Sequence, residues 1–111
     1  MAFSKAQSFD PTSYNQSIWS KALAHPARIH ILNYLLENGK TPFRQLCKII
    51  PLSSTTISQH IRLLRTYHLI EAEEIVPYTY YKLNRKTCAY LALIITNMHI
   101  EFSQLQKGEM D

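Results

Sequence analysis

Two short segments with helical periodicity, separated by a proline, constrain the fold of this chain more than any other feature. In the first segment, Thr41 is expected to cap a helix with Pro42 at its first position, and Pro51 ends that helix. In the second, Ser53 or Ser54 can cap the next helix. Each segment has an apolar face that is expected to be buried. This face consists of Phe43, Leu46, Ile49 and Ile50 in the first segment and of Ile57, Ile61 and Leu64 in the second. Two short helices joined by a tight turn predict a helix-turn-helix.

Two further helices are expected before this motif. The first covers about 13–23, and its apolar stripe consists of Tyr14, Ile18, Trp19, Ala22 and Leu23. The second covers 26–38, because Pro26 fits the first helical position and Gly39 offers a left-handed C-terminal stop. Its apolar residues at helical spacing are Ile29, Leu32, Leu35 and Leu36. Residues 1–12 precede these helices and are expected to form a flexible arm.

The periodicity changes from helical to extended after His68, which stands where a helix-ending glycine would be usual. Histidine adopts the left-handed backbone conformation more often than most residues, so His68 can end the helix in place of glycine. Segments 69–76 and 79–83 are rich in β-branched and aromatic residues, with Pro77 and Tyr78 between them as the turn. This pattern predicts a β-hairpin.

A last helix is expected over 85–106, with a long apolar stripe formed by Leu91, Ile94, Ile95, Met98, Phe102 and Leu105. The predicted fold is therefore mainly α with a small β-hairpin. It is a winged helix-turn-helix of about five helices plus a two-stranded wing, which occupies 13–106 and is followed by a loose tail at 107–111.

The composition suits one cytoplasmic domain without catalytic machinery. A chain of 111 residues with 46% apolar content can bury a compact core. No apolar run approaches the roughly 20 residues of a membrane span, and the first residues lack the apolar centre of a signal peptide. The five histidines are scattered, and two glycines cannot form a glycine-rich phosphate loop. We therefore expect no enzyme activity, no membrane partner and no cofactor.

The start of the second motif helix differs from that of an ordinary surface helix. Its first turn and a half holds six short polar residues: Ser53, Ser54, Thr55, Thr56, Ser58 and Gln59. These residue types are poor helix formers, and an amphipathic helix would rather carry Glu, Lys and Ala on its wet side. A recognition helix presents its N-terminal half to base edges in the major groove, so this pattern favours contact with DNA. The alternative is a Ser/Thr-rich start that only caps the helix.

Positive charge is concentrated around the motif. The chain carries a formal net charge of +4, and residues 40–86 hold eight cations against three anions. Arg62 and Arg65 on the exposed side of the recognition helix suit phosphates, as does Thr56 near its start. The other cations of this stretch that could contact the DNA backbone are Arg44 and Lys48 before the turn and Lys82, Arg85 and Lys86 after it. Each alone is an ordinary surface charge, but their placement indicates a phosphate partner.

These elements, taken in order, resemble the ArsR family, the arsenic-repressor group of small dimeric winged-helix repressors of bacteria, over roughly Trp19 to Leu91. The segments that carry the resemblance are ALAHPARIHILNYLL, LSSTTISQHIRLLRTYHLIEAEE and TYYKLN. The resemblance implies a dimer held by the first and last helices on a palindromic operator. It also implies that the positions that contact bases and backbone in the recognition helix are Ser54, Thr55, Ser58 and Gln59.

The apolar stripe of the last helix is wider than one core can use. We therefore expect a symmetric dimer interface formed by Tyr14, Ile18 and Trp19 of the first helix and by Ile95, Met98, Phe102 and Leu105 of the last. The wing tip carries Glu73 and Glu74 where basic residues are common, so contact between the wing and DNA should be weak or should depend on Tyr78.

The chain departs from the family at the metal sites that release many of its members from DNA. Arg44 stands where a third-helix ligand is needed, and His99 and Glu101 of the last helix have no partners at the right spacing. We therefore expect a repressor without a metal, which responds to an unknown small-molecule effector or acts through its abundance. The alternatives are a thiol switch that uses Cys47 and Cys88, or a winged helix that binds protein instead of DNA.

Overall fold

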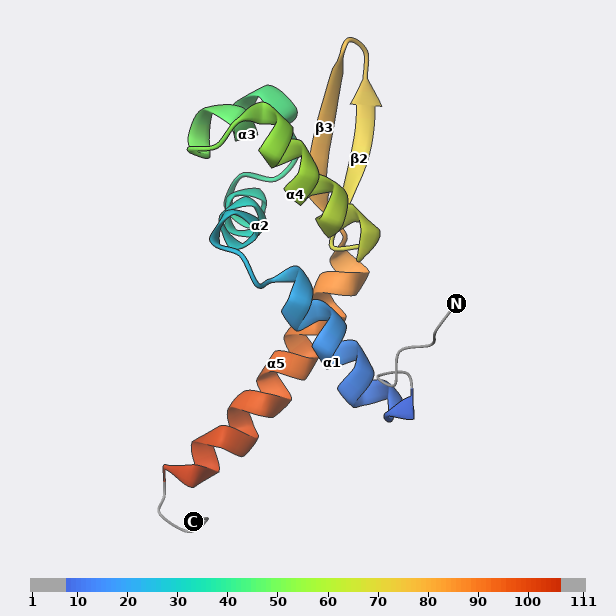
Figure 1. Cartoon of the computed structure of the whole chain (residues 1–111), viewed down its shortest axis with the longest axis vertical. Coiled ribbons are helices and arrows are strands. Elements are labelled where there is room, and N and C mark those ends of the chain that lie inside the picture. Colours follow the sequence, from blue (N-terminus) through green and yellow to red (C-terminus); the bar gives the residue numbers. More distant parts are fainter. Residues whose placement is uncertain (1–7, 107–111) are drawn as a thin grey trace.

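The computed structural model describes residues 8–106 as five helices with a small antiparallel sheet (Figure 1). The elements are α1 (Pro11–Ala22), α2 (Pro26–Asn38), β1 (Thr41–Pro42), α3 (Phe43–Ile49), α4 (Ser54–Thr66), β2 (Ile70–Ile75), β3 (Tyr78–Leu83) and α5 (Arg85–Leu105). The predicted winged helix-turn-helix is confirmed. Most of the expected arm, residues 1–7, and the expected tail, 107–111, lie outside the described residues.

Helix α1 begins at Pro11, two residues before the expected start at Ser13. The side chain of Asp10 accepts a hydrogen bond of 3.3 Å from the Ser13 backbone N–H, and Pro11 takes the first helical position. An aspartate followed by proline is a strong N-terminal signal, because it satisfies one free N–H and removes another. The expected arm is therefore shorter than 1–12.

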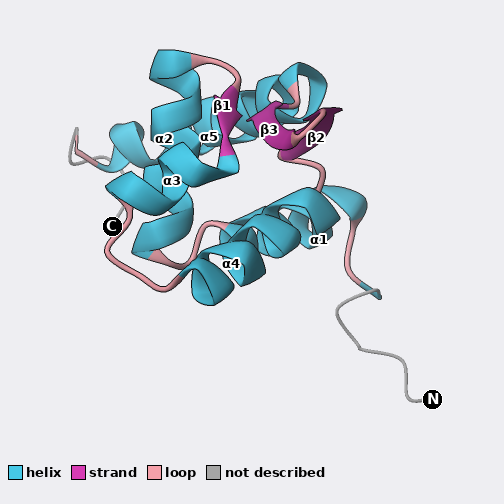
Figure 2. Cartoon of the chain, turned by 90° about the horizontal axis from the view of Figure 1, so that it is seen from above, coloured by secondary structure: helices cyan, strands magenta, loops and turns pink. Residues whose placement is uncertain are grey.

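Thr41 and Pro42 do not start α3 as expected but form the short strand β1. They pair antiparallel with Tyr81 and Tyr80, so the sheet has three strands in the order β1-β3-β2 instead of two. A residue before proline favours extended backbone, which explains the strand at Thr41. Figure 2 shows β1 lying between the end of α2 and the hairpin.

The hairpin forms the wing, and its turn is shifted by one residue from the prediction. Strands β2 and β3 pair from Ile70 with Leu83 to Ile75 with Tyr78. Tyr78 therefore belongs to β3, and the residues that connect the strands are Val76 and Pro77. His68, with φ 60°, ends the helical segment in the left-handed region, as predicted.

The core lies between α2, α3, α4 and the base of the sheet. Its largest fully buried side chains are Ile31, Leu46, Ile57, Leu64 and Leu69. The inward face predicted for α4 is confirmed, but that of α2 is wrong in part, because Ile29 and Leu36 are exposed. The buried positions of α2 are Ala27, Ile31 and Leu35, which follow one another at i, i+4 and i+8. Within the described residues, α5 buries only Ile94.

Candidate nucleic-acid interface

Helix α4 is held by its inner face and leaves its polar start exposed. Ile57, Ile61 and Leu64 anchor it in the core. Ser53 caps it, because its hydroxyl oxygen accepts a hydrogen bond of 3.2 Å from the Thr56 backbone N–H. The Ser53 and Thr56 hydroxyls also share a hydrogen bond of 2.9 Å. Part of the Ser/Thr-rich start therefore does cap the helix, and the half-buried Thr56 has a local partner.

The side chains expected to contact bases are not needed for capping. Ser54, Thr55, Ser58 and Gln59 are exposed, and within residues 8–106 their side chains form no hydrogen bond with the protein. With Phe43 and Arg62 they line one shallow depression of about 400 Å³ on the surface of α4. The structure therefore gathers all four predicted residues, together with a cation and the Phe43 ring, on one exposed surface.

Arg44 and Tyr78, expected separately to contact the DNA backbone, lie against each other. The Arg44 guanidinium carbon is 4.1 Å from the centre of the Tyr78 ring, a cation–π contact between α3 and the wing. Both residues line a second depression, of about 360 Å³, that also contains Ser58 of α4. The sequence did not reveal this contact, since the two residues are far apart along the chain and the pairing of β1 with β3 brings them together.

The remaining cations differ in how free they are. Lys48, Arg62 and Arg65 are exposed, whereas Lys82 lies 3.9 Å from a Glu71 carboxylate oxygen across the hairpin. Lys40 lies 2.8 Å from Glu73, and this hydrogen bond, followed by the charge of Lys40, lowers the pKa of the Glu73 carboxyl. Two of the three wing carboxylates thus have nearby cations. This arrangement reduces the repulsion that the wing would exert on a phosphate backbone.

The segment from the start of α2 to β2 matches a family model. The model is described as bacterial regulatory protein, arsR family, and it matches residues 25–72. Residues 25–72 are similar to this family and are called the arsR-family segment. The resemblance noted in the sequence is thereby confirmed for α2, α3, α4 and the first half of β2.

The arsR-family segment also has named relatives. The arsenical resistance operon repressor of Bacillus subtilis is 34% identical over 64 residues, which cover 58% of this chain and 61% of that protein. The chain thus aligns with less than two thirds of this relative's length. A solved structure of a possible transcriptional regulator for arsenical resistance superposes with a TM-score of 0.69 at 25% identity, covering 82% of this chain and 95% of its own. The structure of HlyU from Vibrio cholerae superposes with a TM-score of 0.66 at 26% identity, covering 78% of this chain and 94% of its own.

Helices α1 and α5 flank the arsR-family segment and carry the residues expected at a dimer interface. On α5 the fractions exposed are 51% for Ile95, 37% for Met98, 60% for Phe102 and 48% for Leu105. On α1, Tyr14, Ile18 and Trp19 are half-buried, and the Trp19 ring lies 5.0 Å from that of Tyr90 in a T-shaped contact. Trp19 therefore already packs within its own chain. Figure 1 shows α1 crossing α5, whose C-terminal half extends beyond the other elements.

The two cysteines of this arsR-type fold are free and pack against the core. Burial raises the pKa of both the Cys47 and the Cys88 thiol, which disfavours the reactive thiolate. The Cys88 thiol also lies 3.7 Å from the Leu69 carbonyl oxygen as a weak donor. These features favour small core residues over a thiol switch. Within residues 8–106 no three His, Cys, Asp or Glu side chains are grouped to hold a metal ion, and no helix there could cross a membrane.

Proposed function

We propose that this chain is a transcriptional repressor that binds double-stranded DNA through α4. The observation that carries the proposal is the exposed polar start of α4, where Ser54, Thr55, Ser58 and Gln59 lie together without partners within the described chain. An α-helix fits the major groove, and its N-terminal half meets the base edges there. The Bacillus subtilis relative, named a repressor, supports the same assignment.

Contacts with phosphates are assigned to the residues that surround this surface. Arg62 and Arg65 extend from the exposed side of α4, and Lys48 from that of α3. Arg44 and Tyr78, held together at 4.1 Å, would meet the backbone as one unit between α3 and the wing. Thr56 and Lys82 are weaker candidates, because the first is engaged in the helix cap and the second lies beside Glu71. Such contacts fix the register of the protein on the duplex without reading its sequence.

A symmetric dimer is part of the proposal, with the winged-helix unit, which begins at Pro11 and not at the expected Ser13, as the protomer. Exposed large apolar side chains continue along the projecting half of α5, and Ile95, Met98, Phe102 and Leu105 are among them. Exposed apolar patches of this kind mark interaction surfaces. Pairing α1 and α5 with those of a second copy would cover them. The two copies of α4 would then be related by the two-fold axis.

Selection of bound duplexes from random DNA tests this function. A two-fold dimer should enrich an inverted repeat whose half-sites lie about 10 bp, or a multiple of it, apart. Affinity for the enriched site should fall steeply with salt, because bound phosphates release counterions. A winged helix that binds only protein would give no enriched sequence and no duplex binding, and that result would contradict the proposal.

The proposed repressor is expected to act without a metal. Arg44, at the position where a ligand is needed, is stacked on Tyr78 instead of facing a set of ligands. Stoichiometric zinc, cadmium or arsenite should therefore leave affinity for the selected operator unchanged. Titration of each ion into the preformed complex, followed by fluorescence anisotropy, measures this. Saturable release of DNA at one ion per protomer would contradict the expectation and would direct attention to the cysteines.

A further inference from the structure

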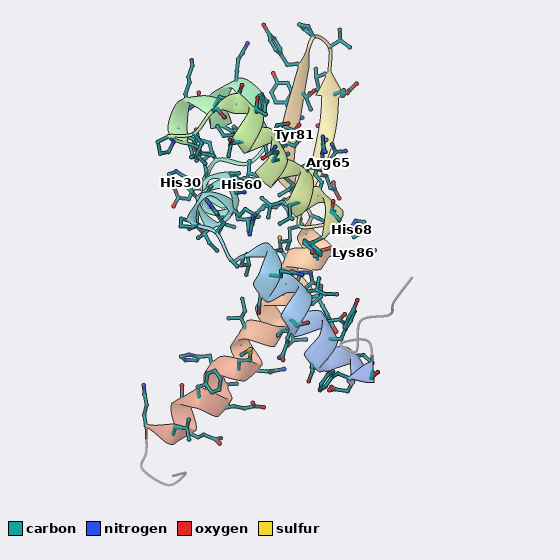
Figure 3. The ribbon with its side chains drawn as sticks, viewed as in Figure 1. His30, His60, Arg65, His68, Tyr81 and Lys86 are labelled. Carbon is teal, nitrogen blue, oxygen red and sulfur yellow. The ribbon has the colours of Figure 1, made fainter. Side chains whose placement is uncertain are left out.

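Two imidazoles and a guanidinium meet where α1, α2 and α4 come together. Arg28 of α2 donates hydrogen bonds to the carbonyls of the last two residues of α1. Its Nε donates to the Ala22 carbonyl oxygen at 2.6 Å, and its Nη2 donates to the Lys21 carbonyl oxygen at 3.3 Å. Its Nη1 lies 3.2 Å from Nδ1 of His60 on α4. His60 projects from α4 toward α2 (Figure 3). Arg28 therefore ties the end of the first helix to the proposed recognition helix.

The contacts require both imidazoles of this cluster to be neutral. Arginine has only donors and keeps its proton at any ordinary pH, so Nδ1 of His60 must accept the hydrogen bond from Arg28. Nδ1 of His25 likewise accepts from the Ala27 backbone N–H at 3.0 Å, which caps α2. Each ring therefore carries its single proton on Nε2. A second proton on either ring would place a donor against a donor.

Acid would also set like charges against one another here. The His25 and His60 ring centres are 4.3 Å apart, so two imidazolium ions would repel at close range, beside a permanent guanidinium. Burial, followed by the charges of His25 and Arg28, lowers the pKa of His60. Those two groups come from α2, while α1 contributes backbone carbonyls. Among the described residues no carboxylate acts on His60 to offset the charge.

We propose that Arg28, His25 and His60 form a pH-sensitive link between α1 and α4, intact when His60 is neutral and broken when it is protonated. The inference rests on the proposed function, because His60 directly follows Gln59 on the helix assigned to DNA. At neutral pH the link holds α4 at a fixed orientation to α1, one of the two proposed dimer helices. With the link broken, α4 stays in its core but is no longer tied to the end of α1, so the spacing of the two copies of α4 about the two-fold axis is less fixed, and specific affinity falls.

The direction of the pH effect follows from the contacts. The intact link excludes a proton that a released His60 would take, so acid favours the released state as pH falls below the ordinary histidine value of about 6.5. One unit below that value the loss can reach about tenfold per protomer. Acid adds positive charge to any protein, and added positive charge by itself strengthens binding to phosphates. A fall in affinity with acid thus opposes the general charge effect.

The experiment compares the full chain with His60→Asn, which keeps an acceptor at the Nδ1 position but does not titrate. Binding to the selected operator is measured at about pH 7.5 and about pH 5.5, where the wild type should lose on the order of tenfold for each protomer of the dimer and His60→Asn should not. His30→Asn removes an exposed histidine of α2 and should behave as the wild type. Arg28→Lys, which cannot reach two carbonyls and an imidazole together, should already bind weakly at neutral pH and show little further loss.

Hydrogen exchange of the free protein separates this proposal from the proposed function. After correction for intrinsic rates, protection of α4 amides should fall between the two pH values in the wild type and stay constant in His60→Asn. A chain that binds no duplex at any pH would contradict the repressor assignment, while exchange would still test the link. Identical pH dependence of α4 exchange in the wild type and His60→Asn, or of operator binding where both proteins bind, would overturn the link.

Discussion

Gln59→Ala should weaken binding to the selected operator by about 1–3 kcal/mol and relax the preference at one base position of each half-site. Gln59 is exposed beside Ser58 in the α4 depression, and its amide can donate to and accept from the edge of one adenine at once. Alanine removes both bonds without disturbing the core, because the anchors of α4 are Ile57, Ile61 and Leu64. The measurement is the affinity for the operator and for its single-base variants.

Controls distinguish base reading from general attraction. Arg62→Ala and Arg65→Ala should weaken operator and scrambled duplexes alike and reduce the slope of log affinity against log salt by roughly one unit each. Gln104→Ala makes the same substitution at an exposed position of α5 and should change nothing in DNA binding. If Gln59→Ala lost the same amount of affinity for operator and scrambled DNA, Gln59 would not be a base-reading residue.

Local signals in the sequence were sufficient for most helix boundaries. Pro26 and Gly39 delimit α2 as predicted, because a proline at the first position and a residue with positive φ at the end act without tertiary contacts. The exposed polar start of α4 could also be predicted, since Ile57, Ile61 and Leu64 fix which side faces inward. The start of α1 was missed although the Asp10 and Pro11 signal was present.

Features that depend on long-range pairing could not be predicted. Thr41 followed by proline suits either a helix cap or an extended segment, and only pairing with Tyr81 of β3 decides for the strand. The Arg44–Tyr78 stack depends on the pairing of β1 with β3. The contact between Arg28 and His60 joins residues 32 positions apart, and the sequence shows only two polar residues on separate helices. Local pattern thus identified the candidate DNA-reading surface, whereas the contacts that orient it required the structure.

Ile95→Asp should convert the proposed dimer into a monomer and reduce affinity for the inverted repeat on the order of 100-fold or more. The two-fold axis would place this carboxylate in the apolar seam twice, where an unpaired charge is costly to desolvate. A monomer engages one half-site at a time, so the gain from linking two α4 helices is lost. Sedimentation at micromolar concentration gives the oligomeric state, and binding to full and half operators gives the loss in affinity.

Ile100→Asp is the matched control on the same helix. Ile95 and Ile100 are exposed to 51% and 53%, so one substitution tests two equally accessible isoleucines. Five residues rotate a helix by roughly 140° beyond a full turn, so Ile100 lies away from the stripe of Ile95, Met98 and Phe102. Ile100→Asp should therefore stay dimeric and bind the full operator. Monomers from both variants would mean that the interface surrounds α5, and dimers from both would remove this stripe from the interface.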